Sequence, residues 1–134
     1  MGLVLVSHSE QLVEGLRAIV SQFGGSDVPV ALAGGTPDGR IGTTAPRIET
    51  AIRSILDTSA EGVLVLLDFG SAMLSLDVAL EWLDPVERAR VRVSDAPLVE
   101  GAVLAGVQAS TGATLDEVAD AARGWQSLPK LPEA

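Results

Sequence analysis

Short apolar runs and helix-like spacings of apolar residues alternate along the first part of the chain. The run Leu3–Val6 has the length of a strand, and Ser7 ends it. The next apolar residues recur at spacings of three, four and seven, the period of a helix with one buried face; they are Leu12, Leu16, Ile19, Val20 and Phe23. Ser7 with Glu10 three residues later has the form of a capping box, so we predict a helix that begins there and ends at Gly24–Gly25.

The same alternation continues towards the end of the chain. Residues 28–33 form a second apolar run, and Thr44-Ala45-Pro46 opens a helical pattern that reaches Leu56. Residues 62–67 are apolar without interruption, as expected of a strand buried on both faces of a parallel sheet. The remaining predicted elements are helices over residues 72–83, closed by Asp84-Pro85, 98–109 and 114–122, and an alternating edge strand over residues 91–93.

Strands that alternate with helices predict parallel pairing, because a connection between parallel strands has to cross the sheet and usually does so as a helix. We therefore predict an α/β fold, a single doubly wound domain with a mostly parallel sheet flanked by helices. A chain of 134 residues has the size of one such domain. We assign residues 1–124 to it and residues 125–134 to a C-terminal tail.

The composition narrows the possible functions. Apolar residues make up 47% of the chain and charged residues 20%, which is typical of a folded domain. No apolar run approaches the roughly 20 residues of a membrane helix. The polar segment Ser7-His8-Ser9-Glu10 comes too early for a signal peptide, so we expect a cytoplasmic protein. A net charge of −9 disfavours nucleic-acid binding.

The chain has no cysteine and one histidine. This excludes disulfides and thiol nucleophiles and leaves little for a transition-metal site, so we predict neither a metal nor a cofactor. The single lysine, Lys130, argues against a lysine-dependent phosphate loop.

In open α/β sheets, ligands bind beyond the carboxyl ends of the strands. Three segments follow predicted strands: Ser7-His8-Ser9, Gly34-Gly35-Thr36 and Asp68-Phe69-Gly70-Ser71-Ala72. We predict His8 in the first turn of a helix, where free amides and the positive end of the helix dipole suit an anion. Ser71-Ala72 marks a second helix start, so two helix ends can converge on one phosphate.

These residues favour phosphoryl transfer to a histidine. A neutral imidazole accepts a phosphoryl group well when one nitrogen is fixed as N–H and the other is bare, and a carboxylate can do the fixing. We predict Asp68 as that carboxylate and His8 as the acceptor. Each residue also has a purely structural interpretation, His8 as a turn residue, Asp68 as a cap or loop residue and Ser71 as an N-cap.

Other motifs at the same positions lack their companions. Asp68-Phe69-Gly70 matches the magnesium tripeptide of protein kinases by letter, but the sequence has no matching glycine-rich loop or strand lysine. Gly34-Gly35-Thr36 lacks the Gly-Lys-Ser/Thr ending of a phosphate loop and is better explained as a tight turn. A response regulator with Asp68 as phosphoacceptor would need acidic residues directly after the first strand and a later lysine in the sheet. The sequence has neither, so this interpretation is set aside.

Four segments carry a resemblance to a known family. They read LVLVSHS over residues 3–9, IGT over 41–43, VLLDFGSA over 65–72 and APLVEG over 96–101. Together, in this order and over roughly residues 3–123, they resemble the mannose-type IIA family of the phosphotransferase system (PTS). Within that family they are most similar to the phosphocarriers of phosphoenolpyruvate-dependent dihydroxyacetone kinases.

The resemblance implies roles for individual residues. The phosphoacceptor position falls on His8 and the orienting aspartate on Asp68. Ser71 and Ala72 match the turn that lies against the phosphoryl group. Gly35 and Thr43 match as neighbours of the site.

The resemblance also implies a reaction and its partners. The protein would be a cytoplasmic phosphotransferase subunit and a homodimer. HPr would phosphorylate its histidine, and the phosphoryl group would pass to ADP bound to DhaL, while DhaK holds the dihydroxyacetone. Some relatives continue into HPr-like and enzyme-I-like domains, whereas this chain stops soon after its last helix, so HPr would act in trans or the chain would be a fragment.

Two other functions stay open at this point. The chain could be the IIA component of a mannose-type PTS sugar transporter, with the same chemistry and a membrane-associated acceptor. It could also be a catalytically silent flavodoxin-like module that only binds partners, with a structural His8.

Overall fold

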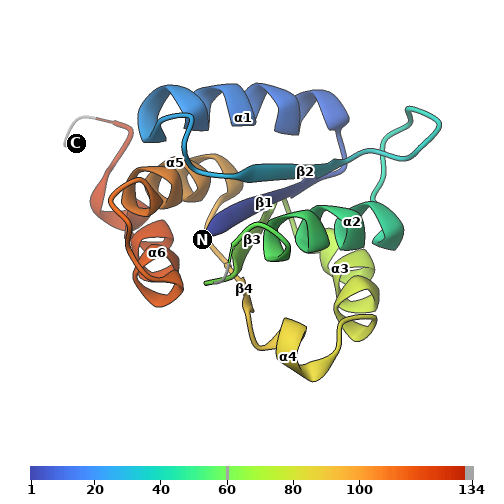
Figure 1. Ribbon diagram of the computed structural model, residues 1–134. Helices are drawn as coiled ribbons and strands as arrows, with labels where there is room; N and C mark the ends of the chain where they lie inside the picture. Colours follow the sequence, from blue (N-terminus) through green and yellow to red (C-terminus); the bar gives the residue numbers. More distant parts are fainter. Residues whose placement is uncertain (60, 132–134) are drawn as a thin grey trace.

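The computed structural model describes residues 1–59 and 61–131 and contains four strands and the helices that connect them (Figure 1). The strands are β1 (Gly2–Ser7), β2 (Val30–Gly34), β3 (Val63–Leu67) and β4 (Val91–Val93). The helices are α1 (Glu10–Gly24), α2 (Ala45–Leu56), α3 (Ala72–Glu81), α4 (Pro85–Arg88), α5 (Leu98–Ala109), α6 (Leu115–Ala122) and the 3₁₀-helix η1 (Arg123–Ser127).

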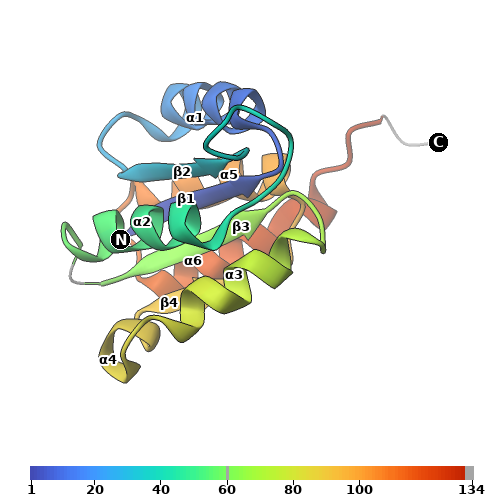
Figure 2. The ribbon, with the colours of Figure 1, turned by 90° about the vertical axis from the view of Figure 1, so that its right-hand side faces the viewer.

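The strands form one sheet in the order β2-β1-β3-β4, and all neighbouring strands are parallel. Alternate residues of β1 point to opposite faces. Leu3 and Leu5 pack in a core with α1, α5 and α6, whereas Val4 and Val6 pack in a core with α2 and α3. Figure 2 shows the sheet between these two layers of helices. The predicted doubly wound α/β fold is confirmed, and so is the position of residues 91–93 at an edge of the sheet.

The two central strands lead to opposite faces. The chain leaves β1 through α1 on one face and leaves β3 through α3 on the other. A crevice forms at such a switch point, because the two connections diverge from neighbouring strand ends. Val6 of β1 is the register partner of Leu67 of β3, so the residues that follow them meet at this edge.

The start of α1 differs from the prediction. Ser9, not Ser7, is the N-cap of α1, and its side chain accepts a hydrogen bond from the amide of Leu12 at 3.3 Å. The predicted Ser7–Glu10 capping box is therefore wrong, and His8 lies before the helix instead of in its first turn. The reason is that the hydroxyl of Ser7 is used by Asp68, to which it donates at 3.0 Å.

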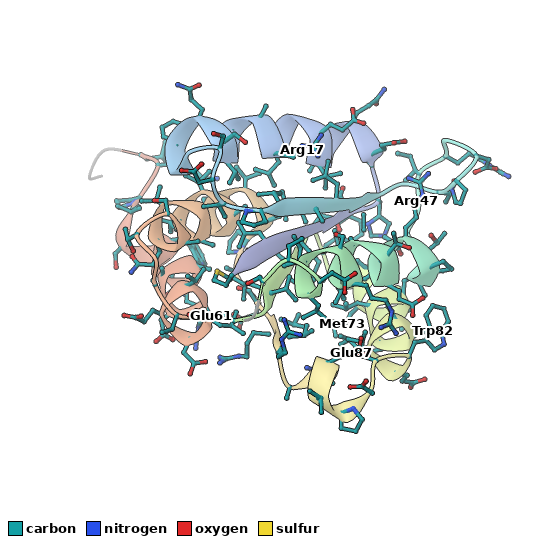
Figure 3. The ribbon with its side chains drawn as sticks, viewed as in Figure 1. Arg17, Arg47, Glu61, Met73, Trp82 and Glu87 are labelled. Carbon is teal, nitrogen blue, oxygen red and sulfur yellow. The ribbon has the colours of Figure 1, made fainter. Side chains whose placement is uncertain are left out.

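The segment that was expected only to close the helix after β3 forms a helix of its own. Asp84 caps α4 through a complete capping box with Glu87, and Pro85 occupies the first turn. Arg53 of α2 pairs with Glu87 and donates to the carbonyl of Trp82 at 3.1 Å, which ties α4 and the end of α3 to α2. Figure 3 labels Trp82 and Glu87 at this side of the molecule.

The C-terminal part folds back onto the domain as far as it is described. Thr114 and Glu117 form the predicted capping box of α6. The helix η1 crosses the predicted boundary between residues 124 and 125, which stays a prediction, and residues 132–134 of the predicted tail lie outside the described residues. Among the described residues, none of the helices is long and apolar enough to cross a membrane.

Candidate functional site

His8 is held at the carboxyl end of β1 by its backbone. Its amide donates to Oδ2 of Asp68 at 2.9 Å, and its carbonyl accepts from the amide of Gly42 at 2.9 Å. The side chain is mostly buried, with 18% of its surface exposed. The histidine is thus fixed between β3 and the loop that precedes α2.

Asp68 accepts hydrogen bonds from four groups around it. The donors are the Ser7 hydroxyl at 3.0 Å, the His8 amide at 2.9 Å, the Phe69 amide at 2.8 Å and Nδ1 of His8 at 3.1 Å. Burial raises the pKa of the Asp68 carboxyl, but the hydrogen bonds from His8, Ser7 and Phe69 outweigh burial and hold that pKa below its ordinary value. Asp68 is therefore a carboxylate at neutral pH.

The two ring nitrogens of His8 have different partners. Because an ionised carboxylate can only accept, Nδ1 carries the proton and donates it to Asp68. In the neutral imidazole, Nε2 is then the bare nitrogen, and it accepts from the hydroxyl of Ser71 at 2.8 Å. Ser71 is the N-cap of α3 but makes no side-chain capping bond, so its hydroxyl is available to the histidine. This arrangement is the one that a nucleophilic imidazole requires.

The phenyl ring of Phe69 stacks on the imidazole of His8. The ring centroids are 4.2 Å apart and the ring planes differ by 4°. Phe69 was not singled out from the sequence as a site residue, although it follows Asp68 directly at a strand end. An apolar residue in a polar loop next to a predicted site residue is a signal that could have marked Phe69 as a candidate. The spacing of residues along the sequence does not reveal that its ring stacks on His8.

The structure brings three of the six predicted site residues together, namely His8, Asp68 and Ser71. Gly35 directly follows β2 and lies beside Glu10 at the start of α1. Its amide donates to the carbonyl of Ser7 at 3.2 Å, and its φ of +70° favours glycine. Thr43 is hydrogen-bonded through its hydroxyl to Ser75 of α3 at 2.9 Å.

Ala72 is fully buried and packs in the core between the sheet and α3. Its amide donates to the carbonyl of Phe69 at 3.1 Å. Its contribution is therefore to fix the turn that carries Phe69 and Ser71.

The surroundings of His8 include a cavity of about 480 Å³ on the side of β4. The cavity is lined by residues 67–70, at the end of β3 and in the turn after it, and by residues 94–97 of the loop after β4. It lies at the carboxyl ends of β3 and β4, and it meets the site at Asp68 and Phe69.

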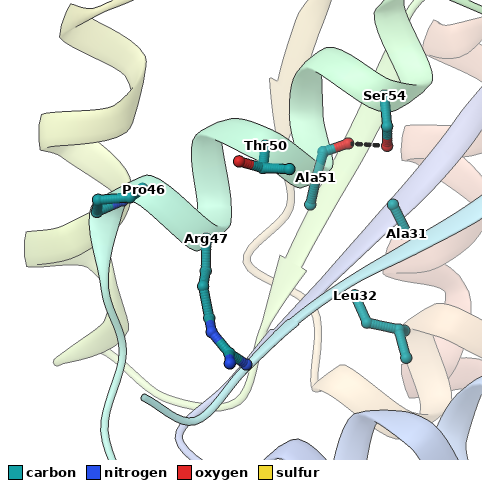
Figure 4. Close-up of a pocket in the computed structure, with 7 residues that line it drawn as sticks. All are labelled: Ala31, Leu32, Pro46, Arg47, Thr50, Ala51 and Ser54. Carbon is teal, nitrogen blue, oxygen red and sulfur yellow. Dashed lines mark hydrogen bonds between the residues drawn. The ribbon is translucent and has the colours of Figure 1, made fainter. Parts of the chain in front are cut away.

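A second hollow, of about 410 Å³, lies between β2 and α2 (Figure 4). None of the six predicted site residues lines it. Arg47 extends from α2 towards the end of β2 and donates to the carbonyl of Gly34 at 2.9 Å. In the described part of the chain, no three metal-ligating side chains come together.

Comparisons with known proteins support one family. Residues 2–119 match the family model EIIA-man, described as PTS system fructose IIA component. The chain is 43% identical over 108 residues to phosphoryl donor subunit DhaM of PEP-dependent dihydroxyacetone kinase 2 from Listeria innocua, covering 81% of this chain and 85% of that protein. It is 46% identical over 121 residues to the DhaM subunit of the PEP-dependent dihydroxyacetone kinase of Escherichia coli, covering 88% of this chain but only 25% of that protein.

A solved structure agrees with these sequences. The crystal structure of the unknown-function protein EF1359 has a TM-score of 0.79 and 29% identity, and the match covers 92% of this chain and 95% of that one. The chain spans about a quarter of the length of the E. coli and Pantoea ananatis DhaM proteins and most of the length of the Listeria protein. The family resemblance seen in the sequence is confirmed: the chain belongs to the EIIA-man family of PTS IIA components.

Proposed function

We propose that this protein is the phosphohistidine carrier of a phosphoenolpyruvate-dependent dihydroxyacetone kinase. In this proposal His8 receives a phosphoryl group from HPr and passes it to ADP bound to DhaL, and DhaK holds the dihydroxyacetone. The observation that carries the proposal is that the two His8 nitrogens have different hydrogen-bond partners. Nδ1 is held by Asp68, and Nε2 faces Ser71. The curated names of the relatives, all DhaM subunits, support the choice of kinase.

The first transfer forms a bond between Nε2 and phosphorus. The lone pair of Nε2 attacks the phosphoryl group of phospho-HPr, the P–N bond to HPr breaks, and HPr leaves with the electron pair. The proton on Nδ1 stays in place, so the phosphorylated ring is positively charged. The Asp68 carboxylate next to Nδ1 stabilises that charge. The Ser71 hydroxyl, released from Nε2, can then donate to a phosphoryl oxygen.

The second transfer reverses this chemistry. A β-phosphate oxygen of ADP attacks the phosphorus, the P–Nε2 bond breaks, and neutral His8 and ATP result. The sequence carries no lysine phosphate loop, so ADP is assigned to the partner DhaL.

The central experiment is phosphorylation with phosphoenolpyruvate, enzyme I and HPr, followed by intact mass measurement. Because His8 is the only histidine, we expect one added phosphoryl group that is labile to acid and stable to base. His8→Ala should gain none. A phosphorylated His8→Ala chain would refute the proposal, as would an unphosphorylated unsubstituted chain, which would favour a silent binding module.

The acceptor is tested with the phosphorylated chain. Mixed with DhaL and ADP, it should lose its phosphoryl group and yield ATP. Transfer to a mannose-type IIB domain, with none to ADP-loaded DhaL, would instead establish a sugar-transport role.

The remaining parts of the proposal concern the whole protein. We assign the carrier function to residues 1–124, the cytoplasm as its location and a homodimer as its state. The exposed apolar residues Leu74, Val78 and Trp82, spaced four apart from α3 onwards, and the free edge at β4 support self-association.

A further inference from the structure

Phe69 occupies a place that the fold alone does not explain. Its side chain belongs to neither of the two buried cores, and 58% of the residue surface is exposed. An exposed large apolar side chain gains little stability from its position. Its aromatic contact within residues 1–59 and 61–131 is the parallel stack on His8.

The same carboxylate places both rings of the stack. Oδ1 of Asp68 accepts from the Phe69 amide at 2.8 Å, and the Asp68 oxygens also accept from Nδ1 of His8 at 3.1 Å. The carbonyl of Phe69 accepts from the buried Ala72 at the start of α3. The phenyl ring is therefore carried by a short, well-anchored turn.

The stack on Phe69 restrains tilting of the His8 ring plane, which the hydrogen bonds of the ring restrain only weakly. The contacts of His8 with Asp68 and Ser71 lie at the two nitrogens, on the edge of the imidazole, so they resist displacement of the nitrogens but only weakly resist tilting of the ring plane. A parallel phenyl ring in contact with one face opposes that tilt.

The need for this restraint is greatest after phosphorylation. Once Nε2 is bonded to phosphorus, it no longer accepts from Ser71, while the hydrogen bond from Nδ1 to Asp68 and the stack on Phe69 both remain. An in-line transfer depends on the direction of the P–N bond, and that direction follows the ring plane.

We propose that Phe69 is a positioning residue for phosphoryl transfer, which holds the plane of the His8 imidazole by stacking and keeps the P–Nε2 bond aligned after Ser71 has released the ring. The part of this inference that concerns phosphoryl transfer rests on the proposed function. The restraint of the ring itself does not depend on the identity of the donor or the acceptor.

The experiment compares Phe69→Leu, which removes the stack but keeps an apolar side chain, with Phe69→Trp, which restores an aromatic face. Phe23→Leu is the matched control, because Phe23 is the other phenylalanine, is 66% exposed and lies near the far end of α1. Circular dichroism checks that all variants are folded. Phosphoramidate phosphorylates each chain without any partner: its P–N bond breaks, ammonia leaves and the P–Nε2 bond forms.

The first readout is ¹³C relaxation of the His8 ring, which gives a single set of signals because the chain has one histidine. In the phosphorylated unsubstituted chain and in Phe23→Leu, we expect an order parameter near that of rigid backbone, about 0.85. In phosphorylated Phe69→Leu it should fall below about 0.6, and Phe69→Trp should restore it. An equally rigid ring in Phe69→Leu would overturn the inference.

The second readout separates positioning from docking. With phospho-HPr as donor, Phe69→Leu should lower kcat by roughly three- to tenfold, the size of one aromatic pair, and leave KM unchanged. A raised KM with unchanged kcat would make Phe69 a mere docking contact and overturn the inference. If HPr fails to phosphorylate even the unsubstituted chain, the proposed function fails, and the relaxation data still decide the role of Phe69.

Discussion

At the scale of single residues, Asp68 is the group that distinguishes the two nitrogens of His8, because its carboxylate holds the proton on Nδ1. We predict that Asp68→Asn slows phosphorylation of His8 by about 10- to 100-fold, because an amide neither fixes the proton on Nδ1 nor balances the charge of the phosphorylated ring. The measurement is the time course of mass increase with phospho-HPr. Asp95→Asn is the control, since Asp95 lines the same cavity but its side chain is 86% exposed. An unchanged rate in Asp68→Asn would reduce Asp68 to a structural cap.

The lowered pKa of Asp68 also predicts how stability depends on pH. A carboxyl whose pKa is lower in the folded chain than its ordinary value of 3.8 stabilises the fold fully above that value, and the contribution is lost as pH falls through the folded pKa. The difference in unfolding free energy between the unsubstituted chain and Asp68→Asn should therefore be constant from pH 7 to about pH 5 and shrink below about pH 4.

Urea denaturation of both chains at pH 7 and at pH 3 measures this difference. The other acidic residues are present in both chains, so their effects largely cancel. A difference in unfolding free energy that does not change between the two pH values would contradict the prediction.

The contact between His8 and Asp68 could be predicted from the sequence more easily than the side chains around it. His8 and Asp68 could be predicted because topology brings strand ends together, whichever side chains pack around them. The hydroxyl of Ser7 was assigned to a helix cap, but it is used by Asp68, which is 61 positions away. The stack of Phe69 on His8 also depends on side-chain orientation after folding, which local spacing does not encode.

At the scale of elements, α1 contains two glycines that occupy opposite environments. A Cβ at Gly15 would meet no atom within 4 Å, whereas a Cβ at Gly24 would lie 2.7 Å from backbone atoms of Gly106 in α5. Gly15→Ala should therefore stabilise the fold by about 0.5–1 kcal/mol through helix propensity. Gly24→Ala should destabilise it by about 1–3 kcal/mol, because α5 has to move away.

Thermal and urea denaturation of these two variants measure both effects. Each variant is the control for the other, since the residue change and the helix are the same. Equal shifts in stability would show that α1 and α5 do not meet as closely as Gly24 and Gly106 indicate.

Elements with a strong period were predictable, and short elements governed by a few contacts were not. Residues 62–67 were identified as a buried strand because both faces are apolar, and β3 indeed packs in both cores. The four residues of α4 carry no amphipathic period, and Asp84-Pro85 fits the end of one helix as well as the start of another. The contact between Arg53 and Glu87 that holds α4 to α2 arises only in the folded chain.

At the scale of the whole molecule, we predict a homodimer that uses the exposed side of α3. Light scattering at micromolar concentrations should give twice the chain mass of 13.8 kDa. Val78→Lys should shift the protein towards the monomer, because it places a charge in the exposed apolar row of α3. Val107→Lys on α5 is the control, since the two valines are similarly exposed, at 41% and 43%. A monomer mass for the unsubstituted chain would rule the dimer out.

The hydrogen bond between His8 and Asp68 joins residues 60 positions apart, and this spacing governs when the site can form during synthesis. The histidine leaves the ribosome with the first strand, but β1 pairs with β2 and β3, which are both made later. Closing a loop of this length costs chain entropy that only the pairing of the central strands offsets. A nascent chain that ends before residue 68 thus has the imidazole without its carboxylate, and the site cannot form until β3 and Asp68 have been made.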